Sequence, residues 1–189
     1  MNVPKFSLLI FLFILVFGCL GCSALEEITN EPYVDLKRFM GDWYVVASIP
    51  TFLEKEAYNP KESYRLNADG TIATAFTFNS GALDGSERAF YPTGFVRDAQ
   101  SNAVWGMQFI WPVKADFRIV FVDDDYRHTV IGRQKRDFLW IMARHPNVKD
   151  IVLEELIQLS VEEGYSRDDI IFPLHDNSHR EQPPIMESK

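Results

Sequence analysis

Hydrophobic and polar residues alternate along most of the chain between residues 43 and 143, with the period of two that is typical of strands with one buried face. The clearest example is residues 71–78, where Ile, Thr, Phe and Phe occupy the even positions. Clusters rich in Gly, Pro, Asn and Asp separate the alternating stretches. The pattern predicts eight strands, at residues 43–49, 62–66, 72–78, 87–97, 103–110, 117–122, 127–133 and 138–143.

The connections between these stretches are mostly short, so consecutive strands are expected to pair as antiparallel hairpins. Such a meander either packs as two sheets or closes on itself. Eight antiparallel strands can close into a barrel whose interior holds one small ligand. The expected fold class is therefore all-β: an eight-stranded, antiparallel, up-and-down barrel.

Helical patterns flank the predicted strands. Apolar residues within 34–40 predict one helical turn that closes an end of the barrel. After the strands, Pro146 and Asn147 predict the start of an amphipathic helix, with Asn147 as its N-cap and Gly164 at its end. Its apolar stripe is expected to pack outside the barrel wall. Residues 170–172 are candidates for a final strand, and the polar tail at residues 174–189 is expected to be disordered.

The first eighteen residues have the pattern of a secretory leader. Lys5 provides a positive charge, and residues 6–17 form an apolar run interrupted only by Ser7. This run is too short for a membrane-spanning helix, which needs about 20 residues, but it suits the hydrophobic region of a signal peptide. The Gly-Cys pairs that follow resemble the lipobox of bacterial lipoproteins, in which the cysteine becomes the diacylated first residue of the mature protein.

Two cysteines fit this role. Cys19 is favoured because the apolar Val16 lies three residues before it, and Cys22, after a Leu-Gly pair, is the alternative. An ordinary secretory leader without lipidation is the other interpretation. The expected division is a lipoprotein signal peptide at residues 1–18 (or 1–21), an anchor and spacer at 19–33, one barrel domain at 34–173, and the tail.

Three separated places resemble the lipocalin family. The first is Gly-Asp-Trp-Tyr at residues 41–44, which opens the first strand; in the family this tryptophan packs across the closed end of the barrel. The second is Asp-Tyr-Arg-His at residues 125–128, similar to the family motif between the sixth and seventh strands. The third is Arg144, just after the last strand. Together with the leader, these places most resemble the bacterial outer-membrane lipocalins.

The resemblance implies structural roles for Gly41, Trp43, Asp125, Tyr126 and Arg144, with Arg144 stacked on Trp43 in a cation–π contact. Side chains that contact a ligand are instead expected nearer the open mouth, where apolar inward positions would line a pocket. The candidates are Phe76, Phe78, Phe90, Trp105, Met107, Phe117 and Trp140. The resemblance also links the subgroup to fatty acids and lysophospholipids, and to membrane maintenance under stress.

The net charge and the sequence motifs disfavour several classes of function. The chain has 19 basic and 27 acidic residues, a net charge of −8, which disfavours nucleic acid as a partner and leaves membrane attachment to the lipid. Nucleophile-elbow, phosphate-loop and dinucleotide motifs are absent from the sequence. His175 and His179 lie in the tail without a helical pattern, and residues 123–125 lack the alternating ligands of a calcium loop. No catalytic residue, metal or cofactor is expected.

The sequence therefore predicts a non-catalytic lipoprotein that binds, stores or transports a fatty acid or lysophospholipid in a barrel pocket. The residue after the lipidated cysteine is not aspartate, which favours the outer membrane, on its periplasmic face. The alternatives are another apolar ligand, such as a quinone, haem or pigment, and a lipid-modifying enzyme on the same barrel. Headgroup preference and formation of a homodimer are left open.

Overall fold

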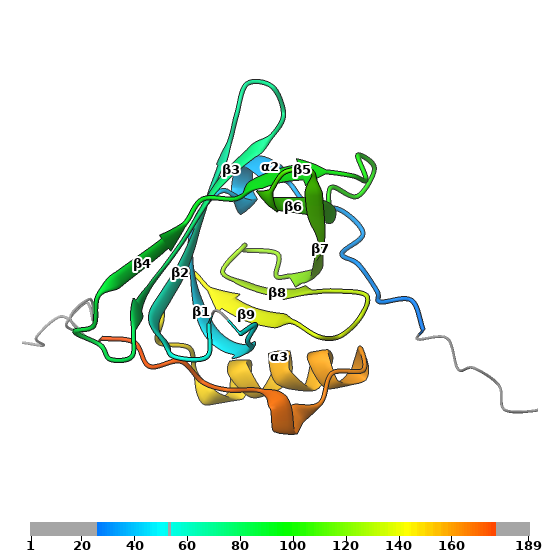
Figure 1. Cartoon of the computed structure of the whole chain (residues 1–189). Coiled ribbons are helices and arrows are strands. Elements are labelled where there is room, and N and C mark those ends of the chain that lie inside the picture. The colour runs from blue at the N-terminus through cyan, green and yellow to red at the C-terminus, as the bar shows by residue number, and fades with distance from the viewer. Residues whose placement is uncertain (1–25, 53, 177–189) are drawn as a thin grey trace, which may run out of the picture.

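The computed structural model describes residues 26–52 and 54–176, and their strands curve around a common interior (Figure 1). The described elements are α2 (Leu36–Phe39), β1 (Gly41–Ile49), β2 (Ala57–Leu66), β3 (Ile72–Ser80), β4 (Glu87–Phe90), β5 (Thr93–Val96), β6 (Val104–Ile110), β7 (Val113–Val122), β8 (His128–Gly132), β9 (Leu139–Ala143), α3 (Asp150–Glu162) and the 3-10 helix η2 (Arg167–Asp169).

The strands form a closed antiparallel ring in the order β1, β2, β3, β5, β6, β7, β8 and β9, and β9 pairs with β1 to complete it. The short strand β4 also pairs with β3, beside the part of β3 that follows its pairing with β5. The expected eight-stranded up-and-down barrel is therefore confirmed, with one extra strand on β3. A closed ring leaves few backbone edges open to pairing with another chain.

The extra strand arises because the predicted strand at residues 87–97 is divided in two. Tyr91 and Pro92 lie between β4 and β5, and a proline has no N–H to donate to a ladder. The Pro92 carbonyl still bonds to β3, where it accepts from the backbone N–H of Thr74 (3.2 Å) and from its hydroxyl (2.8 Å). The prediction of one continuous strand was wrong at this proline.

Two other strands begin earlier than their polar residues indicated. Strand β2 starts at Ala57 and absorbs Asn59 and Pro60 in a register shift, with Asn59 at φ 52°. Strand β7 starts at Val113, so the predicted turn at residues 111–116 shrinks to Trp111 and Pro112, which are joined by a cis peptide bond. Polar residues near strand ends resemble turn residues in sequence, but here they are paired in the ladder.

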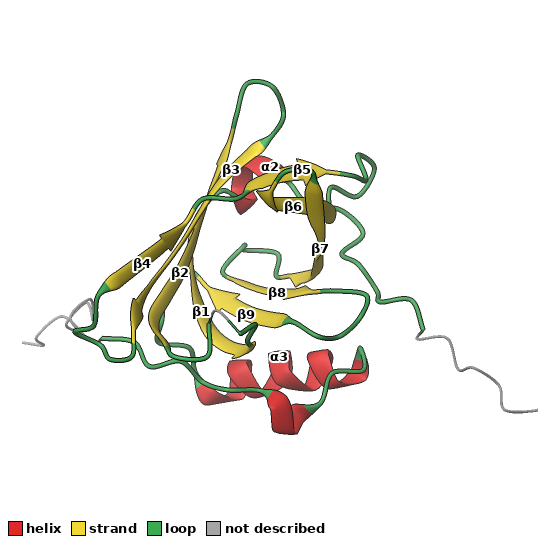
Figure 2. Ribbon diagram, in the orientation of Figure 1, coloured by secondary structure: helices red, strands yellow, loops and turns green. Residues whose placement is uncertain are grey.

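Two apolar cores form on opposite sides of the strands. One lies inside the barrel and contains Phe39, Trp43 and Trp105 at the closed end. The other lies between the outer wall and α3, which runs along the outside of the barrel (Figure 2). There Leu156 and Ile157 pack with wall residues such as Ile141. Strand β9 is buried at all its positions because it serves both cores, which explains its uninterrupted apolar sequence.

Helix α3 packs outside the barrel as expected but begins later. Its N-cap is Lys149, which makes no side-chain capping bond, so the expected capping by Asn147 was wrong. Asp150 occupies the first turn, where its charge favours the helix dipole. Gly164 follows the helix at φ 93°, a conformation that other residues adopt at a cost, and the predicted end of the helix is confirmed.

The segment after α3 is anchored rather than solvated up to residue 176. Ile171 forms an isolated bridge with Ser48 instead of a further strand. Asn59 donates its N–H to Leu174 O (2.9 Å), and His175 Nε2 donates to Val45 O (2.8 Å). The expected disorder of the tail is therefore wrong for residues 174–176, whereas residues 177–189, with His179, lie outside the described residues.

The predicted leader lies outside the described residues, together with Cys19 and Cys22. Within residues 26–52 and 54–176, no helix has both the length and the apolar character needed to cross a membrane.

Candidate functional site

The barrel contains a cavity of about 260 Å³ that opens between the segment after β1, the β6–β7 hairpin and the segment between β8 and β9. This end of the barrel is called the mouth below. The lining is mostly aromatic and aliphatic. Its apolar members are Phe52, Phe76, Phe90, Pro92, Met107, Phe109, Ala115, Phe117, Phe138 and Trp140; its polar members are Thr51, Glu54, Glu62, Asp116 and Arg133.

Five of the seven residues predicted to line a pocket contribute to this wall. They come from β3, β4, β6, β7 and β9, and alternate side chains along a strand point to the same face. The five are Phe76, Phe90, Met107, Phe117 and Trp140. Their rings also contact one another: Phe76 and Trp140 lie 4.9 Å apart between centroids, and Trp140 and Phe138 the same distance apart.

The other two candidates do not line the cavity. Trp105 is fully buried at the closed end, where its ring stacks on Phe117 with centroids 5.2 Å apart and its Nε1 donates to Asn102 O (2.6 Å). Phe78 lies nearer the mouth and packs beside the wall, 5.4 Å from Phe76 and 6.2 Å from Phe90. Both side chains point inward as expected. Inward direction alone did not reveal their depth along the barrel axis.

The closed end is built around Trp43 and Arg144. The guanidinium carbon of Arg144 lies 3.8 Å from the centre of the Trp43 ring, which confirms the expected contact. Arg144 also donates to the carbonyls of Arg38 (2.8 Å), Met40 (2.9 Å), Asp42 (2.8 Å) and Tyr126 (3.1 Å). Trp43 Nε1 donates to Phe39 O (2.8 Å). These contacts tie α2, the start of β1 and the β7–β8 turn into one plug.

The other family-motif residues support this plug. Gly41 has φ 96°, and a Cβ there would lie 3.3 Å from Arg144 Nη1. Tyr126 has φ 57°, and its hydroxyl accepts from Asp35 N (2.7 Å). Asp125 is exposed and pairs with Arg127. None of these residues lines the cavity.

The acidic run at residues 123–125 forms a hairpin turn. The Asp123 carboxylate accepts from Arg127 N (2.6 Å) and lies 2.7 Å from His128 Nδ1. Across residues 26–52 and 54–176, no group of three His, Cys, Asp or Glu side chains is arranged to hold a metal ion.

Three carboxyl-bearing residues line the cavity, Glu54, Glu62 and Asp116, and none of them was predicted from the sequence. Glu54 accepts from Thr51 Oγ1 (2.9 Å) and from Trp140 Nε1 (3.1 Å), and burial raises its pKa above the ordinary value. Glu62 is 1% exposed, and burial raises its pKa well above the ordinary value, although a hydrogen bond with Thr74 partly opposes this rise. The alternation of β2 places Glu62 inward with Tyr64, which was the available signal.

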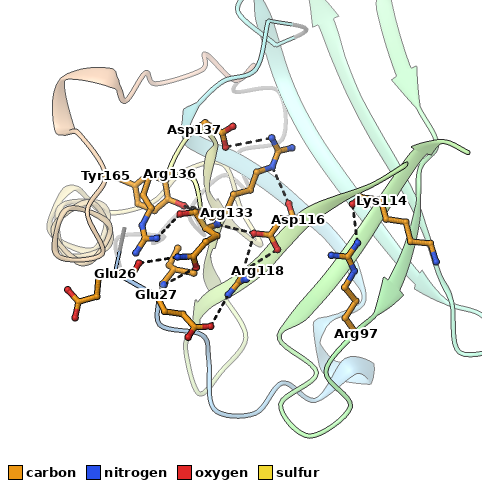
Figure 3. Close-up of polar contacts among 12 residues, drawn as sticks. Glu26, Glu27, Arg97, Lys114, Asp116, Arg118, Arg133, Arg136, Asp137 and Tyr165 are labelled. Carbon is orange, nitrogen blue, oxygen red and sulfur yellow. Dashed lines mark hydrogen bonds and ion pairs between the residues drawn. The ribbon is translucent and has the colours of Figure 1, made fainter. Parts of the chain in front are cut away.

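A cationic group lies at the rim of the cavity. Arg133 follows β8, and its guanidinium carbon lies 4.4 Å from the centre of the Phe138 ring. Its Nε donates to Asp116 O (3.1 Å), and the Asp116 carboxylate accepts from Arg118 Nε (3.1 Å) and Gln134 N (2.9 Å) (Figure 3). This network fixes the direction of Arg133. The site therefore combines an apolar wall, the buried carboxyl group of Glu62, the half-buried carboxyl groups of Glu54 and Asp116, and the Arg133 cation at the entrance.

Comparisons with known proteins agree with this architecture. The lipocalin-like domain family matches residues 34–175. Temperature-induced lipocalin-1 of Arabidopsis thaliana is 31% identical over 160 residues, covering 80% of this chain and 82% of that protein. The outer membrane lipoprotein Blc of Escherichia coli K12 is 28% identical over 154 residues, covering 80% of this chain and 85% of Blc.

Solved structures show the same fold at low sequence identity. Insecticyanin from the tobacco hornworm Manduca sexta has a TM-score of 0.63 at 12% identity, covering 78% of this chain and 84% of that chain. The cockroach allergen Per a 4 has a TM-score of 0.61 at 15% identity, covering 82% and 96%. The family match, the relatives and the plug of Trp43 and Arg144 lead to one conclusion: the chain belongs to the lipocalin family.

Proposed function

We propose that this protein binds, stores or transports a lipid with a single acyl chain, a fatty acid or a lysophospholipid, and that it catalyses no reaction on it. The observation that carries the proposal is the apolar wall of the cavity, which is open at the mouth and closed below by the plug of Trp43 and Arg144. An apolar cavity with a few placed polar groups is the usual design of a site for an apolar ligand.

Arg133 supports an anionic headgroup at the mouth. A guanidinium has five N–H donors in a planar fork that matches a carboxylate or a phosphate. Its Nε is used on Asp116 O, and its Nη1 lies 3.9 Å from the Asp137 carboxylate, too far for a hydrogen bond. The guanidinium therefore has capacity for a ligand anion while the chain extends along the wall.

The test is a titration of the purified protein with palmitic acid and with lysophosphatidylethanolamine, followed by tryptophan fluorescence. Saturable quenching is expected because Trp140 lines the cavity. Trp140→Phe is expected to lose most of the signal, whereas Trp105→Phe, at the closed end, is expected to keep it. Absence of saturable quenching in the wild-type protein contradicts the proposal.

The role of Arg133 is tested separately. Arg133→Gln is expected to weaken palmitate binding by about tenfold, equivalent to about 1.4 kcal/mol, because a charge-assisted hydrogen bond is lost. Binding of hexadecanol, which has the same chain without the anion, is expected to change little. Arg127→Gln, at the exposed closed end, is the matched control.

We further propose that the protein is anchored in the outer membrane, on the periplasmic face, through lipid on Cys19, with Cys22 as the alternative. The name of the relative Blc, an outer membrane lipoprotein, supports this location. Metabolic labelling with a tagged palmitate should modify the wild-type protein and Cys22→Ser but not Cys19→Ser. If labelling survives in Cys19→Ser and is lost in Cys22→Ser, the lipidated residue is Cys22. If the wild-type protein is not labelled, the proposed lipid anchor is contradicted.

A further inference from the structure

A carboxyl group lies in the wall of the cavity just above the plug. Glu62 belongs to β2 and is paired with Trp43 of β1 and with Phe76 of β3. The next inward residue toward the closed end, Tyr64, packs against Phe39 and Trp105 with ring centroids 5.5 and 5.6 Å away. Glu62 therefore occupies the layer between the closed-end aromatic rings and the open part of the cavity.

The hydrogen bonds of Glu62 are incomplete. Its side chain interacts with Thr74, whose hydroxyl donates to Pro92 O (2.8 Å). The Thr74 hydroxyl has a single proton, so its donation to Pro92 O competes with donation to the Glu62 carboxyl. Among the described residues, Glu62 Oε2 has no partner, and neither has Tyr64 Oη at the neighbouring inward position. A buried polar atom without a hydrogen-bond partner costs about 1–3 kcal/mol of stability. A purely apolar ligand would not compensate for this cost.

We propose that Glu62 Oε2 accepts a hydrogen bond from a hydroxyl group on the buried end of the ligand, so that the preferred guest is a hydroxylated fatty acid. This inference rests on the proposed function and specifies its ligand. A methyl end beside Glu62 leaves Oε2 unpartnered. A hydroxyl supplies the missing donor and, at the same time, finds a partner for its own buried oxygen and hydrogen.

The direction and the size of the preference for the hydroxylated acid follow from the cost of burying polar groups. In a purely apolar pocket the hydroxylated acid binds more weakly than its parent, because its hydroxyl loses water without compensation. A site built to hydrogen-bond a hydroxyl reverses the order, because the analogue that lacks the hydroxyl leaves the protein group unpaired. The expected advantage is about tenfold or more in Kd, equivalent to about 1.4 kcal/mol.

The test compares dodecanoic and hexadecanoic acids with their ω-hydroxy derivatives by calorimetric titration of the full chain. Wild-type protein is expected to prefer one ω-hydroxy acid over its parent by about tenfold. Glu62→Leu should reverse the order, and Glu62→Gln, which keeps an acceptor oxygen, should retain the preference. Glu155→Leu makes the same substitution at an exposed position on α3, away from the cavity, and serves as the control.

Each outcome is decisive. Equal binding of parent and hydroxy acids by the wild type overturns the inference but leaves the proposed function intact. A preference that persists in Glu62→Leu also overturns it, because another group must then supply the contact. If no acid binds to the wild type, the proposed function itself fails.

A second inference comes from an independent feature, the exposed apolar rim of the mouth, defined as Phe52 and residues 109–113. Trp111 is 82% exposed, Phe52 81% and Ile110 76%. Val113 is also exposed, and Phe109 is both exposed and part of the cavity wall, as is Phe52. Clustered exposed aromatic and aliphatic side chains mark an interaction surface. This rim is continuous with the entrance of the proposed lipid site.

The N-terminal segment leaves the described structure at the same end of the barrel. Glu26 O accepts from Gln134 Nε2 (3.1 Å), Ile28 N donates to Gln134 Oε1 (3.2 Å), and Glu27 lies 3.9 Å from Arg118 (Figure 3). Gln134 belongs to the segment between β8 and β9, beside Arg133 at the mouth. From Glu26 to Cys19 the chain spans at most roughly 25 Å when extended, and to Cys22 roughly 14 Å.

We propose that the rim enters a lipid bilayer, with the mouth facing the membrane that holds the anchor. The tether keeps the mouth close to the surface, and tryptophan with aliphatic neighbours suits the interfacial region of a bilayer. A lipid then passes between membrane and cavity without crossing water. This inference also rests on the proposed anchor.

The test measures transfer of a fluorescent fatty acid from phosphatidylethanolamine–phosphatidylglycerol vesicles to the full-length protein purified from membranes. Ile110→Asp with Trp111→Asp should slow transfer by about tenfold, because two charges must enter the interface. Ile151→Asp, at an exposed site on α3, should leave the rate unchanged. Unchanged transfer in the rim variant overturns the inference.

Sedimentation supplies the competing outcome. If the wild-type protein without vesicles is a dimer and the rim variant a monomer, the rim binds a second copy of the chain and the membrane proposal falls. If the full-length wild-type protein does not associate with vesicles, the result contradicts the proposed lipid anchor instead.

Discussion

The two ends of the barrel differ in how their polar and aromatic groups are used. At the closed end, Trp43 and Arg144 are surrounded by partners: the Arg144 guanidinium donates to five backbone carbonyls and lies over the Trp43 ring. At the mouth, Trp111 and Phe52 are exposed, and in the cavity beneath, Glu62 Oε2 has no hydrogen-bond partner within the described part of the chain. Trp43 and Arg144 thus have their partners within the protein, whereas the exposed side chains at the mouth are available to other molecules.

This difference separates stability from binding along one axis. A substitution at the plug is expected to lower the free energy of unfolding with little specific effect on ligand choice. A substitution in the cavity wall is expected to act the other way. The physical reason is packing. Side chains in the plug lose close contacts when they are changed, whereas side chains of the cavity wall have no contacts on the side that faces the open cavity.

The largest expected effect is that of Trp43→Ala. Trp43 is fully buried and contacts Phe39 and Arg144. Removing the ring leaves a cavity in the plug and should lower the free energy of unfolding by about 3–5 kcal/mol in urea titrations. A loss below about 1 kcal/mol would show that the mouth, and not the plug, carries the stability.

Arg144→Lys is expected to cost about 1.5–3 kcal/mol in the same measurement, because one ammonium cannot reach all the carbonyls that the planar guanidinium bonds. Arg127→Lys is the matched control. Arg127 pairs with Asp125 in an exposed ion pair, which is worth at most about 1 kcal/mol. Equal losses in the two variants would contradict the special role of Arg144.

Ala115→Trp probes the opposite end. Ala115 lines the cavity, so a large ring there occupies the volume meant for the ligand. Fatty acid affinity should fall at least about tenfold, or about 1.4 kcal/mol, while the free energy of unfolding changes by less than about 1 kcal/mol. Ala89→Trp, on the exposed face of β4, should leave binding unchanged. If Ala115→Trp instead unfolds the protein, this part of the wall contributes to stability as the plug does.

The smallest expected effect is the pH dependence caused by Glu62. Its pKa is raised in the folded protein, so below pH about 4.5 both states are protonated and stability from this group is fully present. As pH rises toward the folded pKa, the unfolded chain ionises first and stability is lost. Glu62→Gln should therefore raise the free energy of unfolding more at pH 8 than at pH 4.

The same urea titrations check the sign. Glu54, whose pKa is also raised, acts in the same direction, and because Glu62 and Glu54 interact, the comparison uses the difference between wild type and Glu62→Gln at each pH. A larger gain at pH 4 than at pH 8 would contradict a neutral, buried Glu62.

Much of the fold could be predicted from local sequence, and most of the cavity wall from its alternation. Residues 71–78 alternate because one face of β3 is buried, and Phe76 lies in the wall as expected. Trp105 has the same inward direction but lies in the plug. The difference is depth along the barrel, which depends on the register between strands and not on any local pattern.

The polar members of the cavity could not be predicted in the same way. Glu62 and Arg133 are ordinary charged residues in sequence, typical of an exposed strand position and a turn. Arg133 is directed by the Asp116 network, which joins segments far apart in the chain. Glu62 is buried because the pairing of β2 with both β1 and β3 closes the ring around it.

By itself the sequence determined the barrel, its outer helix and the Trp43–Arg144 contact, because hydrophobic periodicity and three spaced motifs are local and specific. Tertiary structure alone decided which inward residues meet the ligand, where the buried carboxyl lacks a partner and which end the N-terminal segment leaves from. These properties depend on strand register and on contacts between distant segments, and neither can be predicted from a short stretch of the chain.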